Sequence, residues 1–102
     1  MTSEETAMFQ QCKTEYLTMV QRIESVIKDK WPETLTGNGA IWQWLEESQP
    51  KTRAKQRQLA AQMETAWQNG IFNEFKKLTL EWGRLQLEIF KSYAQHLKET
   101  EA

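Results

Sequence analysis

The chain has 102 residues, a formal net charge of −1 and a single cysteine. A chain of this length folds as one domain around a single modest core. The near-zero charge excludes a global attraction to nucleic acid or to an anionic membrane, so either ligand would need a local patch. The single cysteine excludes an internal disulfide and fits a reducing compartment.

The composition is typical of an all-α protein. Good helix formers dominate, β-branched residues are sparse, and no stretch alternates with a period of two. We expect a single helical domain over residues 1–102, with helices at about 3–30, 40–48, 50–68 and 71–98. The polar, acidic start is atypical of a secretory signal, and no apolar run approaches the ~20 residues of a membrane span. These features predict a cytoplasmic protein without a membrane-spanning segment.

The first predicted helix, residues 3–30, has one apolar face. Thr2 and Glu5 have the spacing of a capping box at its start. Pro32 ends the helix, because the residue before a proline is biased away from helical geometry. Apolar residues recur at steps of three and four, which is the pattern of a helix that packs on one side. This stripe consists of Phe9, Cys12, Tyr16, Met19, Val20, Ile23, Val26 and Ile27.

Residues 32–39 are predicted to form a loop, because the two glycines around Asn38 favour left-handed backbone. The next helix, residues 40–48, is too short to be stable alone and must be held by packing. Its two tryptophans, Trp42 and Trp44, point about 200° apart on a helix. Either one of them lies in an interface, where tryptophan is enriched, or both close the open end of the bundle.

The third predicted helix, residues 50–68, starts with a basic segment. Its first two turns carry four positive charges, no negative charge and almost no apolar residue, so we expect this end to project beyond the core into water. The same charges could contact phosphates, which makes nucleic acid an alternative ligand. Without a wider basic surface such contacts would give weak, salt-sensitive binding. The candidate contacts are Lys51, Arg53, Lys55 and Arg57.

The last predicted helix, residues 71–98, organises the chain because its apolar surface is unusually wide. Two neighbouring stripes cover roughly 220° of its circumference, against roughly 100° or more for an ordinary surface helix. Either this helix sits between two helices of its own chain, or one stripe packs inside and the other meets a second chain. We favour the second alternative, since the chain offers few partner helices. The candidate interface residues are Leu80, Leu87, Phe90 and Leu97, with Trp42 and Trp44 of the short helix.

Residue types that carry catalysis or bind metals are scarce. His96 is the only histidine, and Tyr93 occupies the position at which a Glu-x-x-His metal pair would need its carboxylate. A Cys–His nucleophilic pair would require Cys12 to meet His96, which needs the two long helices to run antiparallel. No third group to orient such a pair is evident. The sequence therefore predicts no enzyme, no metal site and no cofactor.

These patterns together predict an all-α antiparallel bundle of two long helices, one medium helix and one short Trp-rich helix. The function expected first is that of a non-enzymatic interaction protein, either a homodimer or a small subunit of a larger assembly. The alternative is a nucleic-acid-binding helical module of a nucleoprotein complex that uses segment 51–57. A binder of apolar or lipid surfaces, through an opened last helix, is the third expectation.

Overall fold

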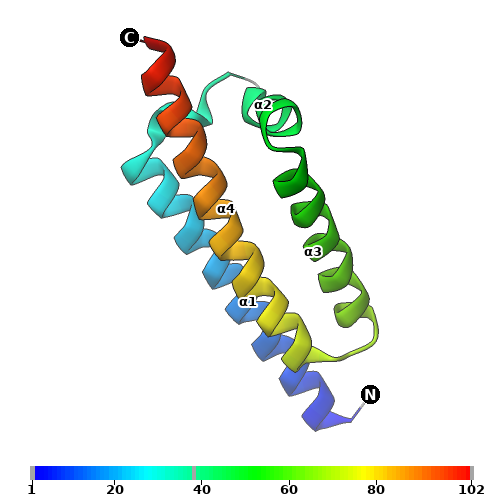
Figure 1. Cartoon of the computed structure of the whole chain (residues 1–102). Coiled ribbons are helices and arrows are strands. Elements are labelled where there is room, and N and C mark those ends of the chain that lie inside the picture. Colours follow the sequence, from blue (N-terminus) through cyan, green and yellow to red (C-terminus); the bar gives the residue numbers. More distant parts are fainter. Residues whose placement is uncertain (1, 38, 102) are drawn as a thin grey trace.

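The computed structural model describes residues 2–37 and 39–101. Within these ranges all regular structure is helical, which confirms the predicted all-α class. Figure 1 shows two long helices side by side, with a third helix beside them and a short helix at one end. The elements are α1 (Ser3–Lys30), the 3₁₀ helix η1 (Pro32–Leu35), α2 (Ala40–Ser48), α3 (Pro50–Gln68) and α4 (Phe72–Glu101).

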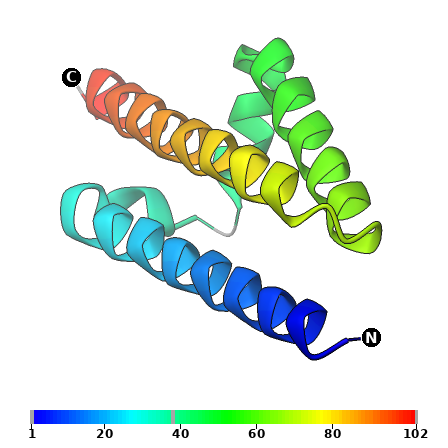
Figure 2. The ribbon, with the colours of Figure 1, turned by 90° about the horizontal axis from the view of Figure 1, so that it is seen from below.

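The helix α4 is central, with α1 on one side of it and α3 on another (Figure 2). The two long helices α1 and α4 run in the same direction, whereas α3 runs opposite to both (Figure 1). The side-chain clusters agree, because Cys12 clusters with Phe75 in the first halves of α1 and α4, and Ile27 clusters with Ile89 in their second halves. Cys12 and His96 therefore lie at opposite ends of the molecule, and the antiparallel pairing that would join them is absent from the described residues.

The predicted capping box at the start of α1 is confirmed. The backbone N–H of Glu5 donates to the Thr2 hydroxyl at 3.2 Å, and the backbone N–H of Thr2 donates to the Glu5 carboxylate at 3.3 Å. These two bonds satisfy amide groups that have no partner within the helix itself. At the other end, the Trp31 N–H donates to the Ile27 carbonyl at 2.8 Å, and the helix stops before Pro32.

The segment predicted as a loop, residues 32–39, contains the 3₁₀ helix η1, which uses Pro32 in its first turn. Gly37 and Gly39 have φ values of 98° and 84°, in the left-handed region that favours glycine. This confirms the predicted left-handed backbone at both glycines. Asn38, on which the prediction was centred, lies outside the described residues.

The contact between α1 and α4 is close at Gly83. This residue is buried in the middle of α4, and a Cβ atom there would lie 3.0 Å from Ile23 Cδ1 and 3.3 Å from Met19 Sδ. A glycine inside a helix costs roughly 1 kcal/mol relative to alanine. The cost is offset here because the missing side chain lets α1 approach α4.

Candidate functional site

The wide apolar surface of α4 is covered mainly by the protein's own helices. Phe90 is only 8 % exposed, and its ring lies edge-on to Trp42, with 5.9 Å between the centroids. Leu87 and Leu97 are half-buried against the same core cluster, whereas Leu80 is 57 % exposed. The helix thus sits between helices of its own chain, which is the alternative that we did not favour. Phe90 belongs to the core and not to an outer stripe.

Both tryptophans of α2 pack against α4. The ring of Trp44 lies 5.2 Å from that of Tyr93 and is stacked on the His96 imidazole at 5.3 Å. The Arg53 guanidinium lies over the ring of Trp42, 5.3 Å from its centroid. Trp42 and Trp44 are half-buried and close one end of the helix assembly, which is the second of the two predicted alternatives.

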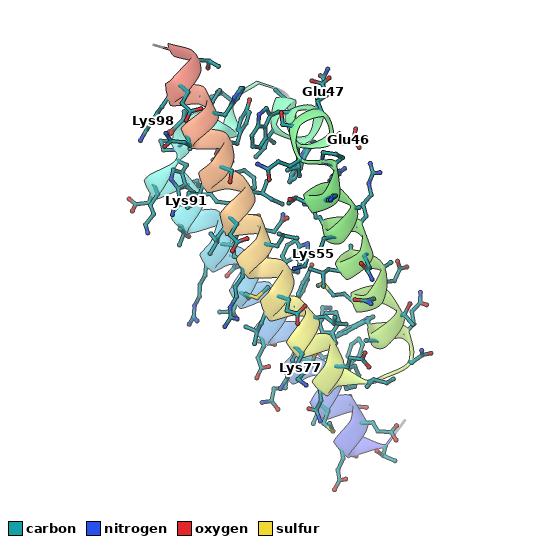
Figure 3. The ribbon with its side chains drawn as sticks, viewed as in Figure 1. Glu46, Glu47, Lys55, Lys77, Lys91 and Lys98 are labelled. Atoms are coloured by element: carbon teal, nitrogen blue, oxygen red, sulfur yellow. The ribbon has the colours of Figure 1, made fainter. Side chains whose placement is uncertain are left out.

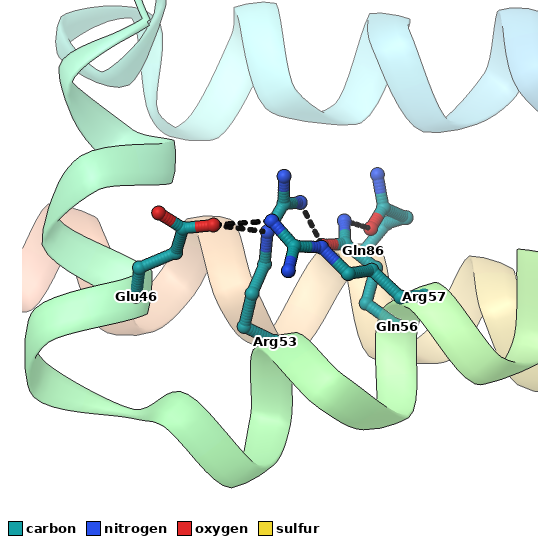
Figure 4. Close-up of polar contacts among 5 residues, drawn as sticks. All are labelled: Glu46, Arg53, Gln56, Arg57 and Gln86. Carbon is teal, nitrogen blue, oxygen red and sulfur yellow. Dashed lines mark hydrogen bonds and ion pairs between the residues drawn. The ribbon is translucent and has the colours of Figure 1, made fainter.

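The basic segment of α3 is bound to its neighbours by a polar network (Figure 4). Arg53 and Arg57 both pair with Glu46 of α2, and the Arg53 Nε lies 3.6 Å from the carboxylate. Arg53 also donates to the Gln56 side-chain carbonyl, and the Gln56 amide donates to Gln86 of α4 at 2.6 Å. Because Gln56 is buried, the prediction that this end of the helix projects into water is wrong. The network joins α2, α3 and α4.

The same network reduces the free charge available to a nucleic acid. Glu46 partly neutralises Arg53 and Arg57, while Lys51 and Lys55 are exposed. A phosphate-binding surface needs several unpaired cations on one face. Figure 3 labels one lysine on α3, Lys55, and three lysines along α4, which are Lys77, Lys91 and Lys98. This distribution gives the nucleic-acid alternative little support.

An open groove runs along α1, with α4 as its floor; its far side is formed by α3 in one section and by η1 and α2 in the other. One section has a cavity volume of about 450 Å³ and the other about 430 Å³. Trp82 lines both sections, so the two adjoin at this side chain. The apolar lining of the first section comes from Tyr16, Leu17, Ala60, Met63, Trp67, Phe75 and Trp82. The apolar lining of the second comes from Val20, Ile23, Ile27, Leu35, Trp42, Trp82 and Phe90.

Aromatic side chains lie at both ends of the groove, and charged side chains line its rim. Phe9 packs on Trp67 with 4.7 Å between ring centroids at one end, and Trp42 with Leu35 lies at the other. Leu17 and Leu35 are 48 % and 51 % exposed. The charged residues of the rim are Lys13, Glu64, Glu24 and Lys28. The groove is therefore an apolar trough with both signs of charge along its edge.

This groove is not apparent from the sequence. Val20 belongs to the apolar stripe of residues 3–30, whereas Leu17, Lys13 and Glu24 lie outside that stripe. A signal was present, because four of the five residues from Tyr16 to Val20 are apolar, which is more than a narrow stripe requires. The contribution of α3 had no such signal, since it depends on how far α3 diverges from α1.

The cysteine and the ion pair beside it are structural in character. Cys12 is buried, and this burial raises the pKa of its thiol, so the reactive thiolate is disfavoured. Glu15 lies 3.0 Å from the Lys76 ammonium on α4, and the hydrogen bond from Lys76 lowers the pKa of the Glu15 carboxyl. The buried Cys12 side chain and the Glu15–Lys76 ion pair both help to hold α1 on α4.

Residues 2–37 and 39–101 contain no cluster of histidine, cysteine and acidic side chains that could hold a metal ion. Within the same ranges, each helix is either too short or too polar to cross a lipid bilayer. The composition of the groove suits the binding of a largely apolar ligand with a few charges. No known protein family, curated protein or solved structure matches this chain.

Proposed function

We propose that this protein is a non-enzymatic interaction protein whose groove along α1 receives a helix. The observation that carries the proposal is the apolar lining of both sections of the groove, with Trp82 on the floor of both and the exposed Leu17 on the wall of the first. Amphipathic helices commonly bind in apolar grooves through side chains spaced by three and four residues. A helix seated here would pack on α1 and α4 in both sections and on α3 in the first, as the fourth helix of a bundle.

The amount of exposed surface supports the proposal. The chain exposes 7275 Å² at a mass of 12.1 kDa. Folded monomers of that mass expose about 6,000 Å², so the excess is roughly 1,200 Å². The radius of gyration is 16.0 Å, whereas a compact domain of this length has about 13 Å. An elongated molecule with an open apolar groove has surface that a partner would remove from water.

The proposal predicts that groove residues contact another protein chain in the cell. A photoreactive amino acid in place of Leu17 should give covalent adducts with a defined protein, which mass spectrometry identifies. The matched control is the same amino acid in place of Leu80, a leucine of similar exposure that lies on α4 outside the groove. Adducts from position 17 that are absent from position 80 support the proposal. Equal adducts at both positions, or none from position 17, would overturn it.

A further inference from the structure

Four residues of α1 form a row along the wall of the groove, and we call them the groove row. Lys13, Leu17, Val20 and Glu24 are spaced at i, i+4, i+7 and i+11, so they share one face of the helix. All four line the groove, with Lys13 and Leu17 in one section and Val20 and Glu24 in the other. Lys13 and Glu24 are exposed and unpaired within the described residues.

The groove row is complementary to itself in one orientation. Suppose that two copies of α1 pack antiparallel, with the two-fold axis passing midway between Leu17 and Val20. Lys13 of each copy then faces Glu24 of the other copy, and Leu17 of each copy faces Val20 of the other. The symmetry of the spacing produces both charge pairs at once. In a parallel pairing, each charge would instead face its own counterpart of the same sign, which is unfavourable. The charges therefore select the antiparallel arrangement.

We propose that the occupant of the groove is a second copy of this chain, docked by antiparallel pairing of the two α1 helices across a two-fold axis. This inference rests on the proposed function and names its partner. In this arrangement α1 of each copy lies in the groove of the other copy, so both copies contribute the same surface to the interface. Such isologous contact is the commonest way in which identical chains form closed dimers.

The dimensions of the groove fit this occupant. Residues 13–28 of α1 line the groove from one section to the other, and a helix of this length spans about 22 Å. The docked segment of the second copy has the same length, because it is the same segment. The excess surface of roughly 1,200 Å² exceeds the about 800 Å² that each partner contributes to a standard interface. The register also brings Lys28 of the second copy to the end of the groove where Glu64 lies.

Charge reversal tests the register directly. The wild-type chain should be dimeric by light scattering and sedimentation at high concentration. Lys13→Glu and Glu24→Lys should each raise the dimer dissociation constant about tenfold, because each reverses two pairs. The double variant Lys13→Glu/Glu24→Lys should restore the wild-type constant, since both pairs form again with their signs exchanged. A mixture of the two single variants should also associate more strongly than either alone.

The control is Lys77→Glu, which changes the net charge as Lys13→Glu does but lies on α4 outside the groove. It should leave the dissociation constant unchanged. A wild-type chain that stays monomeric at every concentration overturns the inference, and so does a dimer that neither single variant weakens. In either case, adducts of position 17 with a different protein would still support the proposed function. Adducts with the chain itself, together with restoration by the double variant, support both.

Discussion

At the scale of single residues, Gly83 shows how one missing side chain positions two long helices. A side chain at this position would enter the space now filled by Ile23 and Met19 of α1. Both neighbours have flexible ends and can move by a few tenths of an ångström, which accommodates a methyl group more easily than a branched side chain. The contact matters for the groove, because α1 supplies one of its walls.

We expect Gly83→Leu to lower the free energy of unfolding by about 1–3 kcal/mol, the usual cost of overpacking a core. Urea unfolding followed by circular dichroism measures the change. The control Arg84→Leu adds the same side chain at the next, exposed position of α4 and should stay within about 0.5 kcal/mol of the wild type. Equal stability of the two variants would show that Gly83 does not determine the spacing of α1 and α4.

At the scale of elements, α2 is a short helix that is held by its neighbours. Leu45 is fully buried and Ile41 nearly so, while Trp42 covers Phe90 of α4. The ion pair from Glu46 to the start of α3 adds a polar connection. A helix of nine residues has little stability of its own, so these contacts determine its position.

The burial of Phe90 beneath α2 predicts a sharp contrast between two positions of α4. Phe90→Glu should lose at least about 3 kcal/mol of stability, since it removes a core ring and buries a charge. Leu80→Glu should change stability by less than about 0.5 kcal/mol, because Leu80 is exposed. Thermal melts followed by circular dichroism compare the two. If Phe90→Glu remains stably helical and only the solution mass falls, Phe90 belongs to an interface between chains.

At the scale of the whole molecule, the central α4 is flanked by α1 and α3, and the side between them is open. The molecule extends over 58 × 27 × 20 Å, so a large share of its residues lies near the surface. A small core with an open side gives limited stability in isolation. Association with a second copy would therefore contribute to the stability of the fold.

The melting temperature of the wild-type chain should rise with protein concentration, because dimerisation stabilises the native state by mass action. We expect a rise of several degrees over a roughly hundredfold range of concentration, measured by calorimetry. The charge-reversed variant Lys13→Glu should show a smaller rise over the same range. A melting temperature independent of concentration in both proteins would contradict the coupling of folding to association.

The local signals in the sequence placed the helices and their breaks. The capping box at Thr2 and Glu5 begins α1, Pro32 and Pro50 stand at the starts of new elements, and Gly37 adopts left-handed backbone. These signals act within a few residues of the chain, through hydrogen bonds and backbone sterics, so no distant contact is needed to interpret them. The all-α class followed from the same local preferences and from the periodicity of apolar residues.

The arrangement of those helices was decided by tertiary structure. Periodicity showed that α4 has a wide apolar surface but not that α2 covers Phe90, because that contact depends on the path of the chain through η1. The sequence shows that the first two turns of α3 are basic, but it does not show that Arg53 and Arg57 pair with Glu46 of α2. The groove depends on the parallel course of α1 and α4 and on the divergence of α3. These properties arise from contacts between residues far apart in the chain, and a pattern within one helix carries no information about the direction or distance of its neighbours.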